Sequence, residues 1–154
     1  MKRLKERAEA SARYPASKDD PSIRGDDDFL CYCLWAHSMR EWIRHDCPKI
    51  AEDLDKQLFQ EMAWDMCRGI ANRVRHFDQL KFPPKDKYWR LFCTYDPLAK
   101  IYSNEAQIEW VLYYNKRRYT VSSVIRMIDE MWANALASIG LDPNEVPDEM
   151  RVSK

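Results

Sequence analysis

The feature that most constrains the fold is an apolar stripe at helical spacing between residues 50 and 77. Its members recur every three or four residues and are Ile50, Leu54, Leu58, Met62, Met66, Ile70, Val74 and Phe77. This spacing puts the side chains on one face of an α-helix. Pro48 suits the first turn of such a helix, where no backbone N–H is needed. The sequence therefore predicts one amphipathic helix of about 28 residues, about 42 Å long at the standard rise.

A second helical pattern precedes this stripe, over residues 29–47. Its apolar positions are Phe29, Cys33, Ala36, Met39 and Ile43. The acidic run Asp26 to Asp28 places negative charge and a capping side chain at the predicted start of the helix. The join around residues 46–49 has room only for a tight corner. The two helices are therefore expected to form a long antiparallel hairpin.

The period of the apolar residues changes after "KFPPKDK". "YWRLFCTYD" is rich in aromatic residues, and "QIEWVLYY" alternates Ile108, Trp110, Leu112 and Tyr114 on one face, which is typical of strands. "NKRR" is a predicted turn, and "YT" is expected to pair briefly as a third strand. Thr120 or Ser122 is then expected to cap a last helix that Gly140 ends.

The predicted fold is α+β and mainly helical: the hairpin, a small antiparallel sheet of two or three strands, and a C-terminal helix across the sheet. Residues 1–25 are expected to be a flexible arm, mobile or locally helical at "KRLKERAEA", residues 26–140 a single globular domain, and residues 141–154 a tail. The expected core residues are Phe29, Leu34, Met39, Ile43, Leu54, Leu58, Met62, Ile70, Val74, Trp110, Leu112, Ile128, Trp132 and Leu136.

Charge and hydropathy exclude several function classes. The chain has 25 basic and 25 acidic residues, so no global field favours nucleic acid or an anionic membrane. No apolar stretch is long enough for a membrane span or a secretion signal. The five cysteines lie mostly in helical apolar patterns, which predicts reduced core thiols in a cytoplasmic protein.

A polar strip follows the apolar stripe of the second helix, with Asp65, Arg68, Asn72 and His76 on one side of it. One interpretation is a solvated face on which Asp65 and Arg68 form an ion pair. Another makes Asn72 and His76 a hydrogen-bonding pair that binds or cleaves a polar ligand, while Arg68 or Arg75 holds an anion. A third is a buried structural network, and for Asn72 we expect a hydrogen bond to neighbouring backbone.

The sequence contains no motif typical of a metal site, a cofactor site or an acyl-transfer enzyme. Cys33 and His37 could form half of a zinc site, but no second pair has the required spacing. The three glycines are too scattered for a phosphate-binding loop. The one dense basic and aromatic cluster is "YYNKRRYT", where Lys116, Arg117 and Arg118 could bind a phosphodiester strand or merely solubilise a hairpin.

"MCRGIANRVRHFDQL", followed by an aromatic strand and "YTVSSVIRMIDEMW", resembles a group of small bacterial proteins of unknown role with HEPN-like helices (the higher eukaryotes and prokaryotes nucleotide-binding class). The matching motif residues are Cys67, Arg68, Ile70, Ala71, Asn72, His76 and Phe77. Arg75 stands where the group has lysine, and Gly69 where it has aspartate. The resemblance spans residues 28–137.

HEPN ribonucleases use an arginine followed after four to six residues by a histidine. Arg40 and His45 have this spacing here, although a random chain of this composition would contain roughly 0.8 such matches. His45 and His76 are expected at opposite ends of the second helix, so only a homodimer would bring them together.

Two functions follow as expectations. The first is a small cytoplasmic interaction or regulatory protein, associated with phage or defence systems, that binds a macromolecular partner, with a protein favoured over RNA. The alternative is a HEPN-like, metal-independent ribonuclease or toxin. The first is preferred because no catalytic motif rises above chance.

Overall fold

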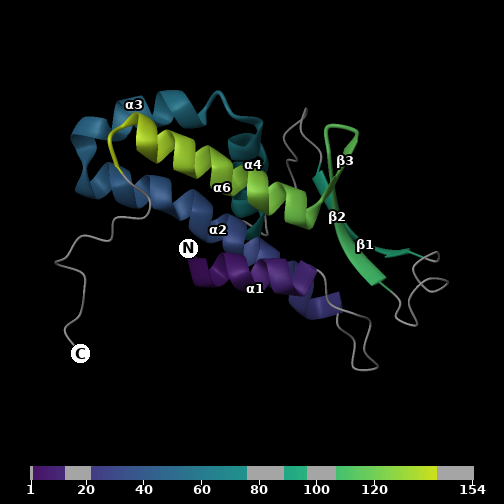
Figure 1. Cartoon of the computed structure of the whole chain (residues 1–154). Helices are drawn as coiled ribbons and strands as arrows, with labels where there is room; N and C mark the ends of the chain where they lie inside the picture. The colour runs from purple at the N-terminus through teal and green to yellow at the C-terminus, as the bar shows by residue number, and fades with distance from the viewer. Residues whose placement is uncertain (1, 13–21, 76–88, 97–106, 142–154) are drawn as a thin grey trace, which may run out of the picture.

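The structure is a computed structural model that describes residues 2–12, 22–75, 89–96 and 107–141. Within these ranges the elements are α1 (Lys2–Ala12), α2 (Ser22–Asp46), α3 (Pro48–Leu58), α4 (Met62–Arg75), β1 (Trp89–Asp96), β2 (Gln107–Tyr114), β3 (Arg117–Thr120) and α6 (Val121–Ser138). Figure 1 shows the helices packed together, with the sheet at one end of the helical layer. The mainly helical α+β fold predicted from the sequence is confirmed.

The predicted hairpin is present, but its second arm is broken. Cys47 forms the corner, Pro48 begins α3, and Asp55 of α3 meets Arg40 of α2. The long helix expected up to residue 77 is wrong, because the chain turns at residues 59–61 before α4 begins. In this turn Gln60 and Glu61 donate backbone hydrogen bonds to Gln57 and Leu58, a tightened last turn that ends α3.

The three strands form one antiparallel sheet in the order β1-β2-β3. Asn115 and Lys116 link β2 to β3, and both have a positive φ, 48° and 63°. Two consecutive residues with positive φ give a turn whose twist matches that of the flanking strands. Trp110, Leu112 and Tyr114 face the core as the alternation predicts, and they are 8%, 0% and 2% exposed.

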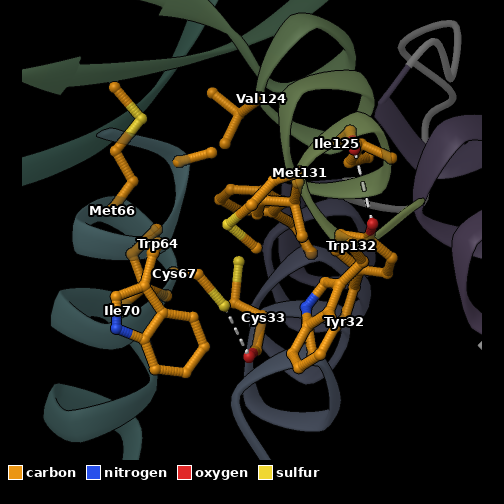
Figure 2. Packing of buried hydrophobic residues seen from close by; sticks show 14 of the residues in the cluster. Tyr32, Cys33, Trp64, Met66, Cys67, Ile70, Val124, Ile125, Met131 and Trp132 are labelled. Atoms are coloured by element: carbon orange, nitrogen blue, oxygen red, sulfur yellow. Dashed lines mark hydrogen bonds between the residues drawn. The ribbon is translucent and has the colours of Figure 1, made fainter. Parts of the chain in front are cut away.

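The core lies between α2, α4, α6 and the inner face of the sheet. Trp64 of α4 packs edge-on against Trp132 of α6, with 6.2 Å between the ring centroids. Figure 2 shows both rings beside Tyr32 and Cys33 of α2. Two predicted core residues, Met62 and Val74, are instead exposed. They lie in the first and last turns of α4, while the middle of that helix supplies the buried residues Ala63, Trp64, Met66, Cys67, Ile70 and Ala71.

The predicted caps of the last helix are confirmed. The Thr120 hydroxyl accepts a hydrogen bond from the Ser123 backbone N–H at 3.1 Å, which satisfies one of the open donors of the first turn. At the other end Gly140 takes a φ of 77°, and the Leu141 N–H bonds to the Leu136 carbonyl. This is the left-handed ending that glycine favours.

The N-terminal residues differ from the expected arrangement. Residues 2–12 of the predicted arm form α1, which packs on α2 and α6, and Ala8 is fully buried. The predicted start of the first long helix after Asp28 is wrong, since α2 begins at Ser22. Asp28 accepts a hydrogen bond from Arg7 of α1 and so links the two helices.

Candidate functional site

Arg40 of α2, a candidate catalytic residue, is held in a structural ion pair. Its Nε and Nη2 donate to the two carboxylate oxygens of Asp55 at 2.6 and 2.7 Å, and its Nη1 donates to Glu41. The side chain is only 12% exposed, and the guanidinium lies over the rings of Phe59 and Trp64. The hydrogen bond to Asp55 raises the pKa of Arg40 further. All three nitrogens are therefore engaged, and two of them hold α2 to α3.

His45, the second member of the predicted pair, points into solvent. Its side chain is 88% exposed and its Nδ1 lies 2.7 Å from an oxygen of Asp46. Arg40 faces α3, whereas His45 contacts its own neighbour in the chain. The structure places the two residues on one helix but does not bring them together at a common site.

The described part of the polar strip on α4 matches the solvated interpretation. Arg68 donates to Asp65 at 3.0 Å, the predicted ion pair, and its side chain is 44% exposed. The Asn72 side chain is exposed, so it does not belong to a buried structural network. His76 lies outside the described residues.

Arg75 reaches across to α2, where its Nη2 donates to the Ser38 hydroxyl. Beside it, His37 is 8% exposed and stacks on Trp64 with 5.3 Å between ring centroids. Burial, and then the charge of Arg75, lower the pKa of His37. Within the described part of the chain, the buried Nδ1 of His37 has no hydrogen-bond partner. Both effects favour the neutral form of this buried imidazole, a role that the sequence did not indicate.

The basic cluster at the end of the hairpin is exposed. Lys116, Arg117 and Arg118 all lie on the surface, in the turn and in β3. The pairing of β2 with β3 sets Arg118 opposite Tyr113 and Arg117 opposite Tyr114. Because neighbouring residues of a strand point to opposite faces, these two arginines lie on different faces of the sheet.

The cysteines divide into two buried and two exposed thiols among the described side chains. Cys33 and Cys67 are fully buried, and the Cys67 thiol donates to the Cys33 carbonyl at 3.2 Å. Burial raises the pKa of Cys33, which keeps it protonated and unreactive. The expectation of core thiols is wrong for Cys31 and Cys47, which are exposed free thiols. In the described residues no cluster of side chains could hold a metal ion.

An exposed stripe on α2 that contains two tryptophans was not identified from the sequence. Trp35 and Trp42 are 45% and 48% exposed, and their rings meet edge-on with 5.1 Å between centroids. With Cys31 and Ser38 they recur at steps of four, three and four residues, the spacing of one helix face. This stripe lies opposite the buried face of α2 and could have been found by testing the helix for two apolar faces.

The described surface also holds one open depression of about 330 Å³, between α3 and the end of α6. Its charged lining residues are Asp53 and Lys56, which pair with each other at 3.1 Å. Ile50 and Ile139 supply its apolar lining. The two charges of the lining are thus paired with each other.

The comparisons with known proteins identify no relative. No protein-family model, curated protein or solved structure matches this chain. Among the described helices none is long and apolar enough to cross a membrane. The candidate sites of this chain are therefore defined by its own geometry, and the most distinctive of them is the exposed tryptophan stripe of α2.

Proposed function

We propose that this protein is a small interaction or regulatory protein that binds a partner protein through the tryptophan stripe of α2, formed by Cys31, Trp35, Ser38 and Trp42. The observation that carries the proposal is the exposure of two adjacent tryptophans on one helix face. Tryptophan is enriched among the residues that dominate binding energy at protein interfaces. An amphipathic helix of the partner, packed along the stripe, would bury both rings.

The surroundings of the stripe support a protein partner. Arg75 flanks it through the contact with Ser38, and Glu41 lies about half exposed on the same helix. A centre of aromatic residues with charged residues at its rim is the usual composition of a protein interface. Cleavage of RNA at Arg40 and His45 has no comparable support, because Arg40 is engaged with Asp55.

The same proposal places the protein in the cytoplasm. In the described part of the chain, the free thiols of Cys31, Cys33, Cys47 and Cys67 support a reducing compartment such as the cytoplasm. The HEPN-like relationship is proposed on the resemblance of the motif around Asn72. An accessory role in phage or defence systems is part of the same proposal.

Affinity capture with the tagged chain tests this function. The variant Trp35→Ala/Trp42→Ala should lose the partner that the wild-type chain recovers from a lysate of its host, while Phe92→Ala/Tyr113→Ala, changed at another exposed aromatic pair, should keep it. Both variants should unfold close to the wild-type temperature because their side chains are about half exposed. Retention of the same partner by the double tryptophan variant would refute the proposal.

A further inference from the structure

The outer face of the sheet carries a second exposed aromatic pair. Phe92 of β1 and Tyr113 of β2 are 42% and 43% exposed, and their rings meet edge-on with 5.7 Å between centroids. Val111 is paired with Phe92 on the same face and is fully buried. On this face a buried valine therefore lies beside two partly exposed aromatic rings.

Basic residues flank these rings in the strand register. Arg90 of β1 is paired with Tyr113, and Arg118 of β3 is paired with Tyr113 from the other side. Both arginines are exposed and lie on the same face as the tyrosine. Lys116 follows in the adjoining turn and is also exposed, whereas Arg117 is paired with Tyr114 and lies on the other face. The outer face thus combines aromatic rings with a row of cations that ends at the hairpin turn.

We propose that this outer face, defined by Arg90, Phe92, Tyr113, Lys116 and Arg118, binds single-stranded nucleic acid. A base can stack on one ring and lie against the edge of the other, since the two rings are nearly perpendicular at 87°. Phosphates on either side would then meet the arginines and the turn lysine. Stacking on aromatic side chains, with cations along the backbone, is how proteins bind single strands without reading their sequence.

The charge of the face favours nucleic acid over a protein occupant. The cations gather around the rings although the whole chain is neutral, with 25 basic and 25 acidic residues. Attraction to a polyanion must therefore be local, and this hairpin supplies a local group of exposed cations. A duplex fits poorly, because its bases are already stacked and cannot lie on Tyr113 or Phe92.

Fluorescence anisotropy with labelled oligouridylate, oligodeoxythymidylate and a DNA duplex tests the proposal at low salt. The wild-type chain should bind both single strands more tightly than the duplex. Phe92→Ala/Tyr113→Ala should weaken binding roughly tenfold or more, whereas Tyr113→Phe, which keeps the ring, should bind nearly as the wild type does. Trp35→Ala/Trp42→Ala on α2 is the matched aromatic control and should bind normally, which separates this proposal from the proposed protein interaction.

The salt dependence gives a second measurement that does not depend on the aromatic variants. Lys116→Gly/Arg118→Ser removes two cations of this face, and glycine suits the φ of 63° at position 116, so the turn is retained. The slope of log affinity against log salt should fall in magnitude by about 1.4, or 0.7 for each phosphate that the variant no longer neutralises. Absence of single-strand binding by the wild type, equal binding of the duplex, or unchanged binding by Phe92→Ala/Tyr113→Ala would each overturn the proposal.

Discussion

At the scale of single residues, the polar groups that look catalytic in the sequence serve the fold. Arg40 joins α2 to α3 through Asp55, and His37 fills the core against Trp64. A spacing of arginine and histidine says nothing about which partners each side chain meets, because those partners come from elsewhere in the chain. The exposed tryptophans Trp35 and Trp42, by contrast, have no structural role that requires their size.

The buried His37 predicts a pH dependence of stability. Burial and the charges of Arg75, Arg40 and Arg68 lower its pKa in the folded state below the ordinary value of 6.5, while Glu41 opposes this. The unfolded state then binds more protons, so stability is highest above pH 6.5 and falls as the pH drops from 6.5 to the folded pKa.

Urea unfolding of the wild type and of His37→Phe measures this effect. Between about pH 7.5 and about pH 5.5 the wild type should lose more stability than the variant, which keeps a ring against Trp64 but cannot be protonated. Carboxylates remote from His37 contribute equally in both proteins and cancel in the comparison. Equal losses would show that His37 is not held neutral in the fold.

At the scale of elements, the sequence predicted the kinds of structure and several of their ends, but not every boundary. The alternation in β2, the capping hydroxyl of Thr120 and the final Gly140 depend on local chemistry, and all three were predicted correctly. The break at residues 59–61 was missed because it contains no proline or glycine and the apolar period continues through it. At that break Phe59 lies under the guanidinium of Arg40 on α2, a contact that the local sequence does not reveal.

The docking of α1 was likewise invisible in the sequence, since it depends on residues more than a hundred positions apart. Lys5 of α1 pairs with Asp129 of α6, and this carboxylate also accepts a hydrogen bond from Tyr32 of α2 at 2.7 Å. The bond to Asp129 raises the pKa of Lys5, and burial raises that of Tyr32. One carboxylate therefore connects three helices.

Hydrogen exchange tests this connection. Asp129→Asn should raise exchange in α1 severalfold, because the ion pair with Lys5 is lost, and should leave α4 nearly unchanged. Glu130→Gln is the matched control: its carboxylate is 66% exposed and lies 3.9 Å from Arg126, so it should have little effect. Similar exchange in the two variants would mean that Asp129 does not hold α1.

At the scale of the whole molecule, the chain presents two exposed aromatic surfaces on different elements. The tryptophan stripe runs along α2, and the pair Phe92 and Tyr113 lies on the sheet at the end of the helical layer (Figure 1). Both pairs are visible in the sequence, but their exposure is not, because an aromatic residue in an apolar pattern is usually buried. For the rings of α2, exposure depends on which side of this helix α4 and α6 cover.

Photocrosslinking from Cys31 tests the central claim, that α2 binds a partner protein along its tryptophan stripe. A benzophenone maleimide on Cys31, in a Cys47→Ser/Cys93→Ser background, should crosslink to the partner. The same probe on Cys47, in a Cys31→Ser/Cys93→Ser background, should not, since that thiol lies roughly 24 Å farther along the chain at the helical rise. Buried Cys33 and Cys67 should stay unlabelled in the folded protein. Crosslinking from Cys47 alone, with none from Cys31, would contradict the account.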